Sequence, residues 1–106
     1  MHSVVTAKRH AIVELCRRFH VRRLEVFGSA ARSTDFDPQR SDTDFMIEFE
    51  PGQDPGMAGF LHLKQALEQT VGRPVDLVDR QAVERSRNYL RRRQILGEAE
   101  PVYVAG

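Results

Sequence analysis

Two aspartates at alternate positions, Asp42 and Asp44, open the stretch Asp-Thr-Asp-Phe-Met-Ile-Glu-Phe. In a β-strand, side chains two residues apart point to the same face, so these carboxylates lie side by side. Like charges at that separation repel, and a fold keeps such a pair where a cation neutralises it or where water solvates it at a strand end. Carboxylate oxygens suit Mg²⁺ or Mn²⁺. The spacing therefore predicts a divalent-metal site.

A glycine–serine pair, Gly28-Ser29, follows the short apolar run Leu24 to Phe27. Gly28 lets a ligand come close to the backbone, and Ala30 to Arg32 can open a short helix whose free N–H groups face phosphate oxygens together with the Ser29 hydroxyl. Arg32 is placed either to touch a phosphate or to serve as a structural arginine. Hydrogen-bond donors that face phosphate oxygens, next to a metal site made of paired acids, indicate a nucleoside triphosphate held by magnesium.

A third aspartate, Asp76, lies within the apolar run Val75 to Val78. An acid inside an apolar strand is costly unless it is paired. It is either a third carboxylate of the metal site or one partner of a salt bridge with Arg73 or Arg80.

Taken together, Gly28-Ser29, Asp42-x-Asp44 and Asp76 resemble the nucleotidyltransferase signature of the polymerase β superfamily, and in particular the minimal nucleotidyltransferases that act as antitoxins to HEPN-domain toxins. The resemblance covers nearly the whole chain. The connection between Ser29 and Asp42 is slightly longer than the usual pattern, which affects loop geometry more than chemistry because loops accept short insertions at low cost.

The resemblance implies an α/β (α+β) fold of the polymerase β-like type, with a small mixed sheet of about three to four strands and flanking helices. It also implies that Asp42, Asp44 and Asp76 are catalytic and hold a pair of Mg²⁺ ions, and that Gly28, Ser29 and Arg32 bind the nucleotide. The implied reaction transfers AMP from ATP to a tyrosine hydroxyl of a cognate HEPN toxin.

The elements that position these residues follow from apolar spacing. Residues 4–19 predict an amphipathic helix, with Ser3 or Thr6 as its cap. Leu24 to Phe27, Asp42 to Phe49 and Val75 to Val78 predict strands. Residues 34–40 predict a loop, in which Asp35 and Asp37 are expected to be solvated rather than to form a second metal pair.

In the second half of the chain, segments rich in glycine and proline alternate with segments whose apolar residues have helical spacing. Gly and Pro between residues 52 and 59 predict a mobile connection. Phe60, Leu63, Leu67 and Val71 predict a helix that ends at Gly72. Residues 81–99 predict a helix interrupted at 85–88, and residues 101–104 an edge strand.

Composition narrows the classes of protein. The 106 residues suit one domain over 1–106, and 41% apolar with 29% charged residues is typical of a folded globular chain. The sequence has no apolar stretch long enough for a membrane helix and none typical of a secretion signal. A cytoplasmic protein without membrane contact is therefore expected. The single cysteine, Cys16, is expected to be a buried thiol, and the four histidines lack zinc-ligand spacing.

Two alternatives remain beside the enzyme. One is an antitoxin that neutralises its toxin by binding alone, although a pure binder has no use for three aspartates. The other is a nucleotidyltransferase for RNA or a small molecule, with phosphates held by the arginines between Arg85 and Arg93. A chain of this length has no room for a lobe that holds such a substrate, and a net charge of +1 exerts no general pull on nucleic acid, so direct nucleic-acid binding is not expected.

Overall fold

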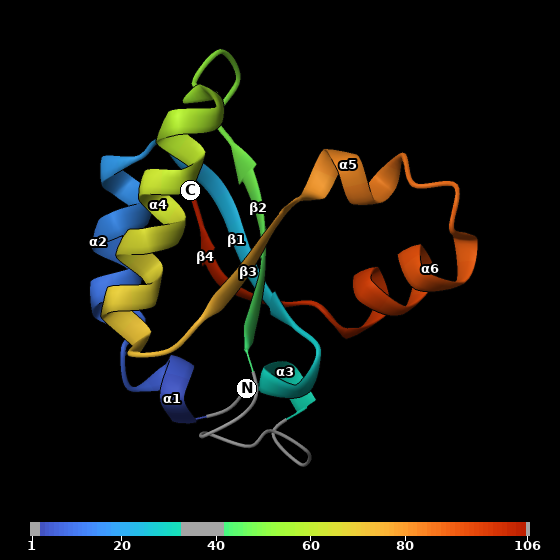
Figure 1. The fold of residues 1–106 in the computed structure, drawn as a ribbon, viewed down its shortest axis with the longest axis horizontal. Helices are drawn as coiled ribbons and strands as arrows, with labels where there is room; N and C mark the ends of the chain where they lie inside the picture. The colour runs from blue at the N-terminus through green and yellow to red at the C-terminus, as the bar shows by residue number, and fades with distance from the viewer. Residues whose placement is uncertain (1–2, 33–41, 106) are drawn as a thin grey trace.

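The computed structural model describes residues 3–32 and 42–105. They form a four-stranded mixed sheet with helices on both faces (Figure 1). The strand order is β3-β2-β1-β4, with β1 (Val21–Phe27), β2 (Thr43–Phe49), β3 (Val75–Asp79) and β4 (Glu100–Val104). The expected mixed α/β fold is confirmed. The loop expected over 34–40, with Asp35 and Asp37, lies outside the described residues.

The sheet separates two apolar clusters. On one face α1 (Ser3–Thr6), α2 (Arg9–Arg18) and α4 (Gly56–Val71) bury the main core, which includes Ile12, Leu67 and Phe45. On the other face α5 (Arg80–Glu84) and α6 (Tyr89–Glu98) cover a smaller cluster of Phe27, Met46, Val83 and Ile95. In Figure 1 these two helices stand apart from the α2–α4 layer, across the sheet.

The strand pairings bring the sites of chemistry to one end of the sheet. β1 and β2 are antiparallel, which sets Phe27 opposite Asp44. β2 and β3 are parallel, which sets Asp44 beside Asp76. The carboxyl end of β1 therefore meets the amino ends of β2 and β3, and α3 (Ser29–Arg32) begins at that point.

The single helix expected over residues 4–19 is wrong in its continuity. The chain turns at Ala7 and Lys8, whose backbone N–H groups donate to the carbonyls of Ser3 and Val5. Lys8 is the N-cap residue of α2 and gives no side-chain hydrogen bond, so neither Ser3 nor Thr6 caps that helix. The break lets Val5 and the buried apolar side chains of α2 both reach the core. Val5 is fully buried although it does not follow the apolar spacing of α2.

Two other boundaries differ. β1 starts at Val21, three residues ahead of the expected Leu24, because Val21 and Arg23 already pair with β2 while the charges of Arg22 and Arg23 stay partly exposed. The expected connection over 52–59 ends early, since α4 begins at Gly56, where the Asp54 carboxylate accepts from the Gly56 N–H at 2.8 Å. Gly59 is helical, and a Cβ there would sit 2.3 Å from the Pro55 side chain.

The expected boundaries in the second half of the chain agree with the structure. Gly72 ends α4 in the left-handed conformation, residues 85–88 separate α5 from α6, and β4 is an edge strand. Cys16 is buried, and burial raises the pKa of its thiol to about 12. Across the two described ranges, none of the helices combines the length and apolar character needed to cross a bilayer.

Candidate active site

Gly28 and Asp44 are in close contact where β1 ends. Gly28 has a φ of 68°, a left-handed conformation that glycine adopts without strain. A Cβ at this position would lie 2.4 Å from Asp44 Oδ2. The turn therefore needs glycine for two reasons, its backbone angle and the space that the carboxylate occupies. The carbonyl of Gly28 accepts from the N–H groups of Ala31 and Arg32, which leaves the first N–H groups of α3 outside the helical ladder.

Three aspartates interact electrostatically at this end of the sheet. Asp44 is partly buried, whereas Asp42 and Asp76 are exposed. The pKa of Asp44 is raised to about 6, first by burial and then by the negative charges of Asp76 and Asp42. Arg32 and Arg91 act in the opposite direction. The structure thus brings together the three aspartates that the sequence singled out.

This arrangement fits a divalent cation. A bound cation would offset the repulsion that raises the pKa of Asp44, and the available donors are hard carboxylate oxygens. Within residues 3–32 and 42–105, no three His, Cys, Asp or Glu side chains are already gathered into a ligand cluster. Asp42 and Asp76 are near enough to raise the pKa of Asp44, but the three carboxylates do not converge on one point.

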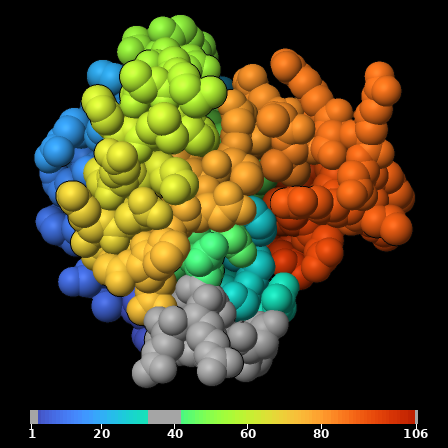
Figure 2. Space-filling model, viewed as in Figure 1, coloured from blue at the N-terminus to red at the C-terminus, as the bar shows by residue number. Residues whose placement is uncertain are grey.

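A cleft of about 400 Å³ opens beside Asp44, between α3 and α6. We call it the α3–α6 cleft. Figure 2 shows the β1–α3 turn and the start of β2 reaching the surface next to α6. Its lining combines the glycine–serine turn with one face of α6: Phe27, Gly28, Ser29, Arg32, Asp44, Arg91, Gln94, Ile95 and Glu98. The predicted phosphate-binding residues and the central aspartate therefore share one cavity.

Arg91 is a cleft residue that the sequence did not single out from the other arginines. Its positive charge lowers the pKa of Asp44 against the burial that raises it. The signal was available, because Arg91 lies four residues before Ile95, the one buried residue of α6, and so shares its face. Within the part of the chain that is described, Arg91 has no carboxylate in an ion pair with it.

Arg32 connects the two sides of the cleft. Its Nη1 donates to Glu98 Oε1 at 2.7 Å, which links α3 to the end of α6. Of the two roles left open for Arg32, the ion pair supports the structural one, and its place in the cleft wall is compatible with a phosphate contact as well.

The salt bridge considered for Asp76 is not formed with Arg80. Arg80 instead donates to the buried Glu25 and also lies 3.9 Å from Glu84. Arg23 approaches the same Glu25 carboxylate at 3.2 Å. Among the described residues Asp76 has no ion pair with Arg73 or Arg80, and its side chain is exposed beside Asp44.

Comparison with known proteins places this site in context. The family model described as "Nucleotidyltransferase domain" matches residues 9–100. The chain is 37% identical over 78 residues to the protein adenylyltransferase MntA of Thermococcus cleftensis, covering 74% of this chain and 72% of that protein.

Solved structures give the same result. A structure described as a minimal nucleotidyltransferase matches with a TM-score of 0.72 and 35% identity, over 95% of this chain and 96% of that one. The complex of a tri-AMPylated HEPN toxin with its MNT antitoxin, from Shewanella oneidensis, matches with a TM-score of 0.63 over 94% of this chain and 72% of that one. At 18% identity, the second match shows a shared fold.

Proposed function

This chain belongs to the nucleotidyltransferase domain family and is a minimal nucleotidyltransferase. We propose that it transfers AMP from ATP to a hydroxyl group of a partner protein. The observation that carries the proposal is the packing of Asp44 against Gly28 and beside Asp76. This packing supports the proposal because it sets a turn suited to phosphate binding beside a set of acids.

The residues divide the work across the ends of three strands. Gly28 and Ser29 follow β1 and bind the β- and γ-phosphates through backbone N–H groups and the serine hydroxyl. Asp42, just before β2, Asp44 on β2 and Asp76 on β3 would hold Mg²⁺, with Mn²⁺ as a substitute. When bound, these ions stabilise the charge on the attacking and leaving oxygens.

The reaction is an in-line displacement at the α-phosphorus. The acceptor oxygen forms a bond to that phosphorus, the bond to the bridging oxygen of the β-phosphate breaks, and pyrophosphate leaves. The acceptor hydroxyl gives up its proton, and the exposed carboxylate of Asp76 is a candidate to receive it. Arg91, facing Asp44 across the cleft, neutralises phosphate charge.

The partner we propose is a cognate HEPN-domain toxin, modified on a tyrosine hydroxyl, so that this chain serves as its antitoxin. The support is the relative described as a protein adenylyltransferase and the matching fold in a complex with an AMPylated HEPN toxin. An added AMP brings bulk and negative charge, which would obstruct an RNA-binding surface.

The outer surface of α6 is suited to receive that partner. Tyr89 and Leu90 expose large apolar side chains, with exposed fractions of 55% and 77%. Arg87 and Arg93 are exposed beside them and form no ion pair among the described residues. An acidic and apolar partner surface docking here would lie next to the α3–α6 cleft.

The test uses ATP labelled at either the α- or the γ-phosphate. The purified chain, Mg²⁺ and the protein encoded by the neighbouring gene should yield a labelled partner from α-labelled ATP alone. Label from the γ-phosphate would indicate a kinase reaction, and no label from either would contradict adenylyl transfer to that protein. Asp44→Ala serves as the inactive control.

A further inference from the structure

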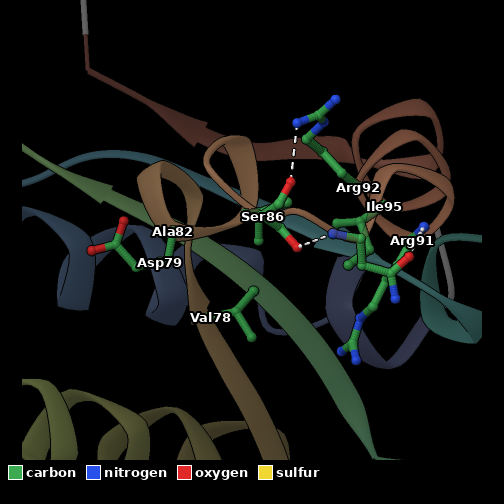
Figure 3. A pocket seen from close by; sticks show the side chains of 9 residues that line it. Val78, Asp79, Ala82, Ser86, Arg91, Arg92 and Ile95 are labelled. Carbon is green, nitrogen blue, oxygen red and sulfur yellow. Dashed lines mark hydrogen bonds between the residues drawn. The ribbon is translucent and has the colours of Figure 1, made fainter.

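A second cavity lies beside the α3–α6 cleft and is not needed for phosphate or metal binding. It has a volume of about 310 Å³ and lies between α5, residues 85–88 and α6. We call it the α5–α6 pocket. Arg91 and Ile95 line both cavities, so the two are neighbours along the same face of α6. Figure 3 shows Val78, Ala82 and Ile95 around the hollow, with Arg91 on the α6 side.

The pocket is positioned to receive the other end of a nucleotide. The α3–α6 cleft reaches Glu98 at one end of the α6 face, and the α5–α6 pocket reaches Asn88 at the other. Ten residues of helix span about 15 Å, comparable to an extended nucleoside triphosphate. A ligand whose phosphates lie at Ser29 would pass Arg91 and place its remaining part in the pocket.

The chemistry of the lining suits a flat heteroaromatic ring. Val78, Ala82, Val83 and Ile95 supply aliphatic surface from β3, α5 and α6. Arg91 lines both cavities, so its guanidinium group would lie between the ring and the phosphates.

The polar rim is held in place before any ligand binds. Asn88 Oδ1 accepts from the Arg91 N–H at 3.2 Å, and the Asn88 N–H donates to Ser86 Oγ at 3.2 Å. Arg92 Nη1 donates to the Ser86 carbonyl at 3.0 Å, as drawn in Figure 3. The cap uses one lone pair of Oδ1, which leaves the amide N–H₂ of Asn88 and a second lone pair to meet a ligand.

From this geometry we infer that the α5–α6 pocket is the subsite for the purine base of the nucleotide, with Asn88 reading the base edge. Asparagine amides pair with the N6 and N7 positions of adenine, donating to one and accepting from the other. A phenol from the acceptor protein presents a single hydroxyl to this amide, whereas the adenine edge presents a donor and an acceptor side by side. The inference rests on the proposed function, because it assumes that the phosphates occupy the α3–α6 cleft.

Filling the pocket separates base binding from phosphate binding. Ala82 is an exposed α5 residue of the pocket wall, and Ala82→Phe places a ring in the cavity. Gln81→Phe is the matched control, since Gln81 is the adjacent exposed residue of α5 and does not line this pocket. Titration calorimetry with Mg²⁺ should compare β,γ-imido ATP, the corresponding CTP analogue and inorganic tripolyphosphate on each variant.

We expect Ala82→Phe to weaken binding of the ATP analogue at least about tenfold, with tripolyphosphate binding unchanged and Gln81→Phe behaving like the parent. Asn88→Asp should lower affinity for the ATP analogue about tenfold as well, because it keeps the helix cap and removes the amide donor. It also keeps the inference testable if Ala82→Phe misfolds.

If Ala82→Phe and Asn88→Asp fold and bind the ATP analogue as the parent does, the pocket does not hold the base. Loss of transfer to the partner in those variants would then assign the pocket to the acceptor side chain. If the parent binds neither the ATP analogue nor tripolyphosphate, the proposed function fails together with this inference.

Discussion

Replacing Asp44 with asparagine should make the metal-free protein more stable at neutral pH. The folded-state pKa of Asp44 is raised from 3.8 to about 6, so the folded chain holds this proton more tightly than the unfolded chain. The stabilisation from protonation is fully present below about pH 3.8 and is lost as the pH rises through about 6. Above that range the charged carboxylate is a cost, which asparagine removes.

The magnitude follows from the size of the shift. A change from 3.8 to about 6 corresponds to about 3 kcal/mol at full weight. Asp44 is only partly buried, and screening by solvent reduces the expected gain in the free energy of unfolding to about 1–2 kcal/mol.

Urea denaturation in the presence of EDTA measures this difference. At about pH 7.5, Asp44→Asn should be more stable than the parent by that amount, and at about pH 4 the difference should be close to zero. Asp54→Asn is a matched control, because Asp54 is exposed and its Oδ1 contact with Gly56 is available to asparagine too. An Asp44→Asn protein that is no more stable than the parent at pH 7.5, or equally stabilised at both pH values, would show that the Asp44 charge does not destabilise the fold.

Other variants test the turn, the docking surface and the core. Ser29→Ala should raise the KM for ATP and lower kcat, with kcat/KM falling about 10–100-fold in a transfer assay, and Gly28→Val should lose more, because its side chain meets Asp44; normal turnover by both would reduce the motif to a simple turn. Arg87→Glu combined with Arg93→Glu should weaken partner binding about tenfold and flatten its salt dependence while ATP affinity is kept, as calorimetry at two ionic strengths would show; an unchanged partner affinity would exclude α6 as the docking surface. Leu67→Ala should cost about 2–5 kcal/mol in urea denaturation, because Leu67 is fully buried; a cost below about 1 kcal/mol would argue against that packing.

Local sequence patterns predicted the structure correctly at positions where few other residue types would fit the conformation. Gly28, with its positive φ, and Gly72, which ends α4, were both predictable because few other residues tolerate those conformations. The alternation of Asp42 and Asp44 predicted their common face, and the parallel register of β2 and β3 then placed Asp76 beside Asp44.

Other features could not be predicted from the sequence because they depend on tertiary contacts. Glu25 is buried inside an apolar-looking strand because Arg23 and Arg80 approach it, and Arg80 comes from 55 residues away in the sequence. Arginine density alone did not separate Arg91 from its neighbours; its spacing from Ile95 was a signal, but its place in the cleft depends on how α6 packs against the sheet. The break between α1 and α2 likewise depends on where Val5 finds the core.

Intact-mass spectrometry of the partner protein, co-expressed with this chain, measures whether AMP is transferred to it. We expect the partner to gain the mass of one or more AMP groups, and the gain to be absent when the chain carries Asp44→Ala. A partner that stays unmodified with the parent chain, and that the Asp44→Ala form binds and silences equally well, would contradict transfer and make this chain an antitoxin by binding alone.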